Sequence, residues 1–221
     1  MRNFSEKIDQ QQFAEFCNQL GEQLLKPLPG SLSHDKMSSR VRLKELESDY
    51  DLSKAIRSSV LILFYLKKNI LHTSFILRQS YDGVHSGQVS FPGGRWEDSD
   101  GSLVNTALRE AREEVNIDPT SVHVIGTLSE LYIPPSNFVV LPVVGFTNKQ
   151  PEFKPDELEV AEIIESDISF LFNPERIKNT IINVRGYQIE APYFDVNGKI
   201  IWGATAMILS ELKDIIESLG L

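Results

Sequence analysis

Three glutamates close together in the chain could hold a divalent metal ion: Glu110, Glu113 and Glu114, within residues 109–114. At about 100° per residue they fall within a wedge of roughly 100° around a helix. Carboxylates at this spacing repel one another, and a cation would remove that repulsion. Because the cluster contains no His or Cys, Mg²⁺ or Mn²⁺ fits it better than zinc. The alternative is a solvated, salt-bridged surface helix, since Arg and Glu alternate at helical spacing.

The residues before this helix favour the metal site. Residues 87–91 alternate like a short strand, and Pro92, Gly93 and Gly94 then predict a turn whose glycines can bring the backbone against a bound ion. Either Ser102 or Asp100 can cap the helix that follows. On that helix, Arg109 projects next to Glu113 and could fix its rotamer, whereas Arg112 is expected to face water.

With these residues in place, the chain resembles the Nudix hydrolase family, whose signature is G-x5-E-x7-R-E-U-x-E-E-x-G-U, with U an aliphatic residue. Residues 109–117 match the second half, except that Asn116 stands where the signature has Gly. The change is mild, because Asn also tolerates a left-handed helix end. The first half departs more: its Gly would fall at Arg95 and its Glu at Gly101. Three acids of the longer loop are candidate stand-ins for that Glu: Glu97, Asp98 and Asp100.

The longer loop and the residues before it resemble the coenzyme A pyrophosphatase branch of this family, which carries an upstream element LLTxRSx3Rx3Gx3FPGG. Arg78, Gly87 and the FPGG sequence match it. Gln79 stands at the Ser position and Gly83 at the second Arg position, where a guanidinium suited to phosphate is expected. Two other basic residues could compensate for that missing arginine: Arg95 and His85.

The resemblance implies metal-assisted hydrolysis of the diphosphate bond of a nucleoside-diphosphate derivative. Coenzyme A or its thioesters would yield 3′,5′-ADP and 4′-phosphopantetheine. The implied metal ligands are Glu110, Glu113 and Glu114, with a backbone carbonyl of Gly93 or Gly94, for Mg²⁺ or Mn²⁺. The implied catalytic residues are Glu110, Glu113 and Arg109. The general base is left open between Glu110, Glu113 and an acid in residues 156–162, where Glu159 and Glu162 are the candidates.

Two other functions stay open. The substrate could instead be ADP-ribose, a dinucleotide or a diadenosine polyphosphate, or the chain could be a non-catalytic nucleotide-sensing module on the same fold. The presence of all three acidic ligands argues against the sensor. Four residues are expected to bind the substrate: Arg78, Arg95, Tyr132 and Asn137. The last two lie in an aromatic, proline-stiffened segment, residues 131–138, for which the residues alone favour an ordinary connection between strands.

Composition narrows the class of partner. The 221 residues carry a formal net charge of −9, which disfavours a nucleic-acid groove, so a small nucleotide substrate is expected. The single Cys17 rules out an internal disulfide and suits a reducing cytoplasm. The longest apolar run, residues 60–66, is far shorter than the roughly 20 residues that span a bilayer, and no export signal is recognised. The chain is therefore expected in the cytoplasm.

The predicted fold is α/β: a Nudix-type α/β/α sandwich with a central mixed sheet and an N-terminal helical extension. Residues 1–53 are expected to form a helix and a wrapping extension, and residues 54–221 the Nudix hydrolase domain. By family analogy, two copies of the chain could pair through the N-terminal region. Lys67, Lys68 and Asn69 predict a hairpin turn. Helices are expected at residues 4–25 and 204–219, and strands at 60–66, 71–78, 122–128, 139–146, 159–164, 187–194 and 200–202.

Overall fold

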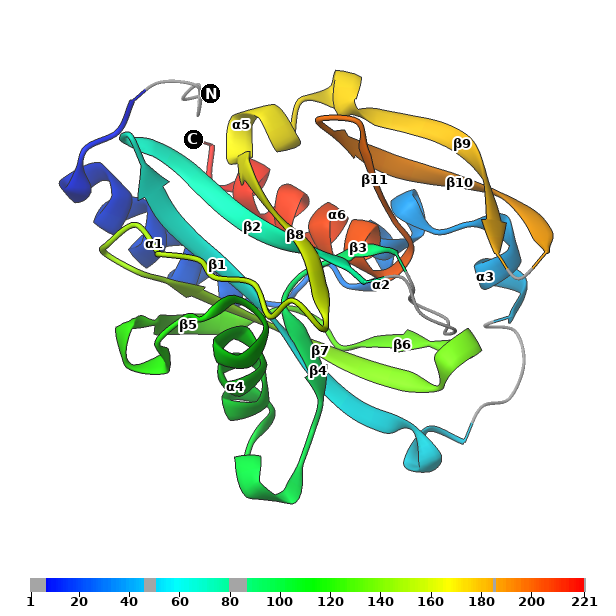
Figure 1. Ribbon diagram of the computed structural model, residues 1–221. Coiled ribbons are helices and arrows are strands. Elements are labelled where there is room, and N and C mark those ends of the chain that lie inside the picture. Colours follow the sequence, from blue (N-terminus) through cyan, green and yellow to red (C-terminus); the bar gives the residue numbers. More distant parts are fainter. Residues whose placement is uncertain (1–6, 46–50, 80–86, 185, 221) are drawn as a thin grey trace.

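The computed structural model describes residues 7–45, 51–79, 87–184 and 186–220 of the protein. The strands of this part of the chain form one mixed sheet and one smaller antiparallel sheet (Figure 1). The strands are β1 (Ile56–Lys67), β2 (Ile70–Arg78), β3 (Val89–Ser90), β4 (Gly93–Arg95), β5 (His123–Thr127), β6 (Leu131–Ile133), β7 (Phe138–Phe146), β8 (Val160–Asp167), β9 (Ile177–Val184), β10 (Tyr187–Val196) and β11 (Lys199–Trp202). The α-helices are α1 (Gln10–Leu24), α2 (Ser31–His34), α3 (Arg40–Glu45), α4 (Leu103–Val115), α5 (Ile168–Leu171) and α6 (Gly203–Ser218). The 3-10 helices are η1 (Asp35–Met37), η2 (Leu52–Lys54), η3 (Asp98–Asp100), η4 (Pro119–Ser121), η5 (Pro134–Ser136) and η6 (Pro174–Arg176).

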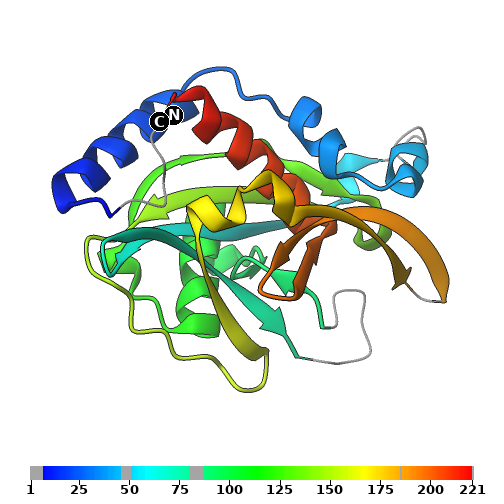
Figure 2. The same ribbon diagram turned by 90° about the horizontal axis from the view of Figure 1, so that it is seen from above.

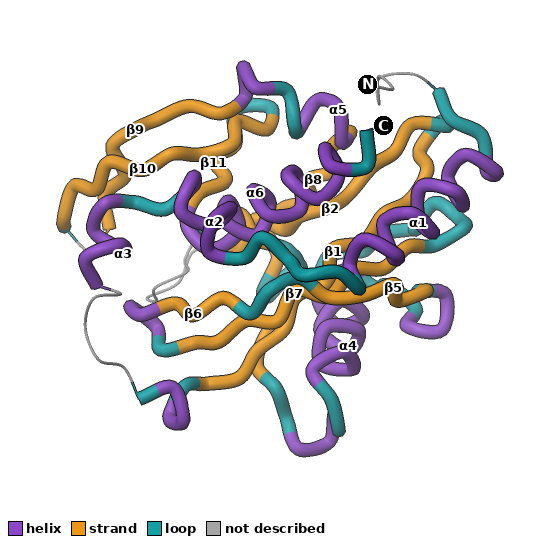
Figure 3. Tube along the Cα trace, turned by 180° about the vertical axis from the view of Figure 1, so that it is seen from behind, coloured by secondary structure: helices purple, strands orange, loops and turns teal. Residues whose placement is uncertain are grey.

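The mixed sheet is the centre of the molecule. Its strand order is β3-β2-β1-β7-β5, with β4 paired to β1, β6 to β7 and β8 to β2. Among the strand pairs of the described residues in this sheet, only β1–β7 is parallel. Helix α4 covers one face, and α1 and α6 cover the other (Figures 1 and 3). This arrangement confirms the predicted α/β/α sandwich with a mixed sheet.

Strand β1 is buried on both faces, which explains its unbroken apolar run. Ile62 and Phe64 pack into the core under α1 and α6, whereas Leu61, Leu63 and Tyr65 pack against α4 on the opposite side. Successive strand residues point to opposite faces, so each half of the run supplies a different core. The strand thereby fixes the position of α4 relative to the rest of the sandwich.

The N-terminal helix belongs to the main core. Phe13, Phe16 and Leu20 of α1 are buried in the same cluster as Met207 and Leu209 of α6. Figure 2 shows the two helices next to each other over one face of the sheet. The division of the chain between residues 53 and 54 stays a prediction. Among the described residues, no helix is both long enough and apolar enough to cross a membrane.

Most predicted elements are present, and the β1–β2 turn is confirmed in detail. Lys67 lies opposite Ile70, and the two residues between them, Lys68 and Asn69, both have positive φ. That geometry belongs to the two-residue turns that follow the twist of a hairpin. The predicted helix at residues 204–219 is likewise confirmed as α6, and Ser102 caps α4 by accepting a hydrogen bond from the Asn105 N–H at 3.2 Å.

The start of the first helix was predicted too early. Residues 4–6 lie outside the described part of the chain, and α1 begins at Gln10 rather than before it. Asp9 sets this start, because its side chain accepts a hydrogen bond from the Gln12 N–H at 2.8 Å and the Gln12 side chain accepts one from the Asp9 N–H at 2.9 Å. Such a reciprocal capping box ends the helical hydrogen bonding on the N-terminal side.

The turn predicted at the glycine pair was also wrong. Gly93 and Gly94 form strand β4 and pair with Val60 and Ser59 of β1. Local sequence favours a turn at Pro-Gly-Gly, but pairing with a strand some thirty residues earlier overrides it. Strands β4, β6 and β9 were not predicted. β9 is exposed along most of its length, so no apolar alternation marks it.

Candidate active site

Two glycines bring β4 close to both β1 and α4. A Cβ on Gly93 would lie 2.3 Å from the Ser59 carbonyl oxygen and 2.6 Å from the Val60 Cα. A Cβ on Gly94 would lie 2.5 Å from Oε1 of Glu110. Any larger residue would therefore push β4 off β1 or displace the Glu110 carboxylate, so the glycines are required by close approach.

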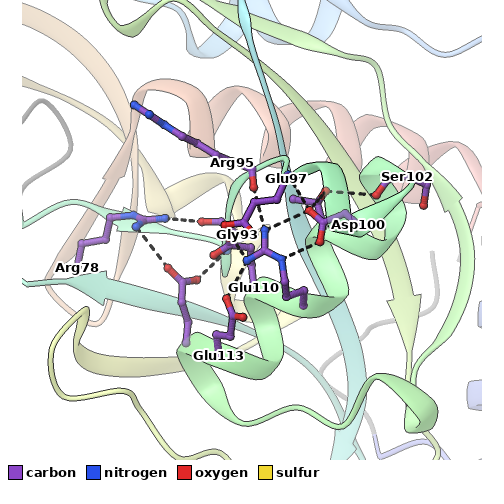
Figure 4. A network of polar contacts seen from close by, with 11 residues as sticks. Arg78, Gly93, Arg95, Glu97, Asp100, Ser102, Glu110 and Glu113 are labelled. Carbon is purple, nitrogen blue, oxygen red and sulfur yellow. Dashed lines mark hydrogen bonds and ion pairs between the residues drawn. The ribbon is translucent and has the colours of Figure 1, made fainter.

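Glu114 connects Arg78 and Gly93, two labelled members of the polar network in Figure 4. Its side chain is 2% exposed, accepts a hydrogen bond from the Gly93 N–H at 2.7 Å and lies 3.3 Å from an Arg78 guanidinium nitrogen. Arg78 also donates to the Gly93 carbonyl at 2.8 Å and to the Ser90 hydroxyl at 3.2 Å. Arg78 thus ties together β2, β3, β4 and α4.

Burial destabilises the ionised form of two of these carboxylates. It raises the pKa of Glu114 to about 7, although Arg78 and the Gly93 N–H act in the opposite direction. Burial also raises the pKa of Glu110, opposed mainly by Arg109. The negative charge of Glu159 adds to both increases in pKa. A third acid therefore lies within electrostatic range of Glu110 and Glu114.

Arg109 connects the loop before α4 with the carboxylates on it. Its Nε lies 2.7 Å from Asp100, and one terminal nitrogen lies 3.0 Å from Glu110 and 2.8 Å from Glu113. The other terminal nitrogen donates to the Arg95 carbonyl at 2.9 Å. Of the three loop acids considered as stand-ins for the missing Glu, Asp100 takes this buried position, with a side chain that is 3% exposed.

The donor chemistry fits a hard divalent cation. The charge of Glu110 raises the pKa of Glu114, and carboxylate oxygens are the ligands that Mg²⁺ or Mn²⁺ prefers. The side chain of Glu113 is 58% exposed and lies on the solvent side of the same helix. Within the described ranges, no three His, Cys, Asp or Glu side chains are already grouped closely enough to hold a metal. Glu110, Glu113 and Glu114 are now engaged by arginines or the backbone, so ion binding requires side-chain movement.

The two candidate bases beyond α4 occupy different surroundings. The Asp156 N–H donates to the Glu114 carbonyl at 2.9 Å, and the Glu159 N–H donates to the Asp156 carbonyl at 3.2 Å, so this loop is fastened to the end of α4. Glu162 instead forms an ion pair with Lys199 of β11. The structure therefore brings Glu159 toward the carboxylates and gives Glu162 a partner on the other sheet.

A cavity of about 710 Å³ lies beside β4. Arg78, Gly93, Gly94 and Arg95 line its edge nearest α4. Its other walls come from the N-terminal segment, η5, β7, β10 and the start of α6, and they are largely apolar; examples are Met37, Val41, Ile133, Phe138, Ile189 and Met207. A volume of this size suits a nucleotide-sized ligand.

The four predicted substrate residues do not all reach this cavity. Arg78 and Arg95 line it, and the Arg95 guanidinium lies 5.2 Å from the centre of the Phe138 ring. Tyr132 and Asn137 are not among the lining residues; the Tyr132 hydroxyl donates to the Asn137 side chain at 3.1 Å, and the Asn137 amide donates to the Lys54 carbonyl at 3.0 Å. Gly83 and His85 lie outside the described residues.

Sequence reasoning missed the lining residues from distant parts of the chain. Arg42 and Met37 precede β1 in the chain, and Trp202 and Met207 lie in β11 and α6, more than 85 residues after the acidic helix. They share no spacing or motif with the acidic helix, so no local pattern connects them with it. Ser90, which accepts a hydrogen bond from Arg78, was also missed, although it lies directly before the matched FPGG sequence.

Comparison with known proteins agrees with this geometry. The family model of the NUDIX domain matches residues 56–186. An uncharacterized Nudix hydrolase NudL from Pectobacterium atrosepticum is 41% identical over 142 residues, covering 63% of this chain and 73% of that protein. An uncharacterized Nudix hydrolase NudL from Yersinia pestis is 32% identical over 210 residues, covering 94% and 96%. The solved structure of a MutT/nudix family protein from Enterococcus faecalis has a TM-score of 0.51 at 13% identity, covering 83% of this chain and 72% of that one, a likeness of fold alone.

Proposed function

Because this chain belongs to the Nudix hydrolase family, and is thus a pyrophosphohydrolase, we propose that it hydrolyses the diphosphate bond of coenzyme A or its thioesters. The products are 3′,5′-ADP and 4′-phosphopantetheine. One observation supports this proposal most: Arg78, Gly93 and Gly94, which lie against the glutamates of α4, line one edge of a cavity whose farther walls are largely apolar. The diphosphate fits the polar edge, and the flexible pantetheine arm fits the apolar walls.

Mg²⁺ or Mn²⁺ would be held by Glu110, Glu113 and Glu114, with a backbone carbonyl of Gly93 or Gly94. Such an ion, when bound, neutralises diphosphate oxygens and lowers the pKa of a water. Arg109 orients Glu110 and Glu113 through its contacts at 3.0 and 2.8 Å. Arg78 fixes Glu114 against Gly93 and presents its guanidinium at the cavity edge, where a phosphate oxygen can accept from it.

Glu159 is the residue we favour as general base. Its loop is fastened to the end of α4, and its charge raises the pKa of both Glu110 and Glu114. Glu162 is engaged with Lys199. A base must come within hydrogen-bond reach of the water from which it takes the proton, and Glu159 is the candidate in this loop whose charge acts on the α4 carboxylates.

A substrate panel tests the function. The purified chain is given Mg²⁺ or Mn²⁺ with coenzyme A, acetyl-coenzyme A, ADP-ribose, NADH and diadenosine polyphosphates, and the products are identified. Coenzyme A and its thioester are expected to be cleaved with the highest kcat/KM, and EDTA is expected to abolish turnover. Preferred cleavage of another compound in the panel would identify that compound as the substrate and would leave the family assignment unchanged. Binding without cleavage of any member, at any metal concentration, would instead favour a nucleotide sensor.

Location in the cytoplasm and pairing of two copies through the N-terminal region stay predictions. Substrate contacts by Tyr132 and Asn137 also stay predictions. Their side chains bond to each other, and Asn137 also bonds to the Lys54 carbonyl, so they support the cavity wall formed by Ile133 and Phe138. Their replacement is expected to act on substrate binding through that wall.

A further inference from the structure

The charged side chains that the structure describes in the cavity lining are all of one sign. Each of them is an arginine: Arg42, Arg78 and Arg95. Among the described residues no Asp or Glu contributes to the lining, although the chain has 31 acidic residues against 22 basic ones. A cavity with this lining favours a ligand with several negative charges, which the overall charge of −9 would otherwise repel.

Two of these arginines belong to the edge near the acidic helix. Arg78 contacts Glu114 and the Gly93 carbonyl, and Arg95 follows directly after Gly94 on β4. The diphosphate of the substrate must lie at this edge if the α4 glutamates are to act on it. Arg78 is therefore accounted for by the scissile diphosphate, whereas the Arg95 guanidinium extends over the ring of Phe138.

Arg42 enters the cavity from a different direction. It lies on α3 in the N-terminal segment, and its guanidinium donates to the Tyr132 carbonyl of β6 at 2.7 Å. Arg78 instead donates to the Gly93 carbonyl of β4, and strands β1 and β7 lie between β4 and β6 in the sheet. Because neighbouring strands are about 4.8 Å apart, the carbonyls that hold Arg78 and Arg42 are separated by three strand spacings, roughly 14 Å. One phosphate group is too small to contact both.

We propose that Arg42 binds a further phosphate of the substrate, a monoester on the ribose that is not part of the scissile diphosphate. This inference rests on the proposed function and narrows it to 3′-phosphorylated adenosine nucleotides. A ribose with phosphates at its 3′ and 5′ positions separates two anionic groups by one sugar ring, which matches guanidinium groups held on separate strands, Arg78 at β4 and Arg42 at β6. Arg42 suits this role because its planar fork can bind phosphate oxygens in pairs and its bond to Tyr132 orients that fork.

The first experiment measures binding by calorimetry, with adenosine 3′,5′-bisphosphate and AMP as the probes. The two molecules differ only in the 3′-phosphate. The wild-type chain is expected to bind the bisphosphate roughly tenfold more tightly or better, as a charge-assisted hydrogen bond would give. Arg42→Gln should reduce the preference to less than about twofold and leave AMP affinity unchanged, and Arg42→Lys should restore part of it.

Arg40→Gln is the matched control, because Arg40 lies on the same helix, is exposed and does not line the cavity. It should keep the full preference for the bisphosphate. Thermal unfolding of each variant separates lost binding from lost folding. Equal affinity of the wild-type chain for both probes, or an equal loss for both in Arg42→Gln, would overturn the inference.

The second experiment compares coenzyme A with dephospho-coenzyme A as substrates. Arg42→Gln is expected to raise KM for coenzyme A about tenfold with little change in kcat, and to leave dephospho-coenzyme A unaffected. If both compounds are cleaved equally well by the wild-type chain, the proposed function stands and the Arg42 inference fails. If neither is cleaved, the proposed function fails, and the binding experiment still decides the role of Arg42.

Discussion

At Glu114, a carboxylate that is 2% exposed meets one guanidinium, one backbone N–H and the charges of two other glutamates. Arg78 offsets part of this repulsion, yet burial still raises the pKa of Glu114 to about 7. A buried acid whose charge is incompletely compensated is suited to receive a cation, and such groups occur more often at functional sites than elsewhere.

Glu114→Gln tests the residue directly. The amide keeps the shape and an oxygen that can accept from the Gly93 N–H but loses the charge that a metal ion requires. Turnover is expected to fall on the order of a hundredfold or more, with the fold retained by circular dichroism. Glu157→Gln is the control, since Glu157 is exposed and should change neither property. Unchanged activity and Mg²⁺ dependence in Glu114→Gln would refute the metal assignment.

The two glycines of β4 should respond differently to the same substitution. In Gly94→Ala the new methyl group meets the end of a movable side chain, Glu110, so the protein should fold while turnover falls on the order of a hundredfold because that carboxylate is displaced. In Gly93→Ala the methyl group meets the backbone of Ser59 and Val60, so stability should fall by about 3 kcal/mol or more. Urea unfolding and steady-state kinetics of both variants check the contrast; equal stability losses would contradict it.

At the scale of elements, the loop before α4 is built around one ion pair. Asp100 accepts from Arg109, from the Thr106 hydroxyl at 2.8 Å and from the Glu97 N–H at 3.0 Å. The hydrogen bond from Arg109 is the main reason that the pKa of Asp100 is lowered to about 2. In this longer loop Asp100 therefore anchors Arg109, although its spacing from Arg109 differs from that of the Glu in the family signature.

This pKa gives a pH dependence with a definite sign. An Asp in an unfolded chain has a pKa near 3.9, so the stabilisation from Asp100 is present above about pH 4 and is lost as pH falls toward about 2. Asp100→Asn should lower stability at pH 6 and reduce the further loss between pH 4 and 2, as measured by urea midpoints at each pH. Asp98→Asn, at an exposed position in the same loop, should leave the wild-type pH profile unchanged. Parallel profiles for wild type and Asp100→Asn would contradict this account.

At the scale of the whole molecule, one buried carboxylate connects the N-terminal segment to the sandwich. Glu211 of α6 is fully buried, lies 3.0 Å from Nε2 of His34 and accepts from the Ser129 hydroxyl at 2.6 Å and from the Gly30 N–H at 3.0 Å. Burial by itself would raise the pKa of Glu211, but these partners outweigh it and lower that pKa. The connection holds in place the segment that carries Met37 and Arg42 to the cavity.

Glu211→Ala should therefore destabilise the protein by about 3 to 5 kcal/mol, because it leaves buried donors without an acceptor. The measurement is the free energy of unfolding in urea. Glu217→Ala on the same helix removes only an exposed ion pair with Lys213 and should cost less than about 1 kcal/mol. Losses of similar size in the two variants would contradict a larger contribution of the buried cluster to the free energy of unfolding.

Local sequence determined much of this protein. The wedge of glutamates on α4, the Ser102 cap and the Lys68-Asn69 turn depend on residues only a few positions apart, and they are present as expected. The apolar run of β1 was also readable, because burial on both faces leaves no polar position. By contrast, β9 could not be predicted from the sequence, since an exposed strand carries no such pattern of apolar residues.

The tertiary structure decided what chemistry surrounds those glutamates. Pairing with β1 turned the glycine pair from an expected turn into a strand, and packing brought Glu159 toward α4 while it paired Glu162 with Lys199. Packing also assembled the cavity from the N-terminal segment, the sheet and α6. Spacing along the chain specifies which residues share a helix face, because that geometry repeats every few residues. Contacts between distant segments follow from the folding of the whole chain, so only the fold could place Arg42 in the same cavity as Arg78.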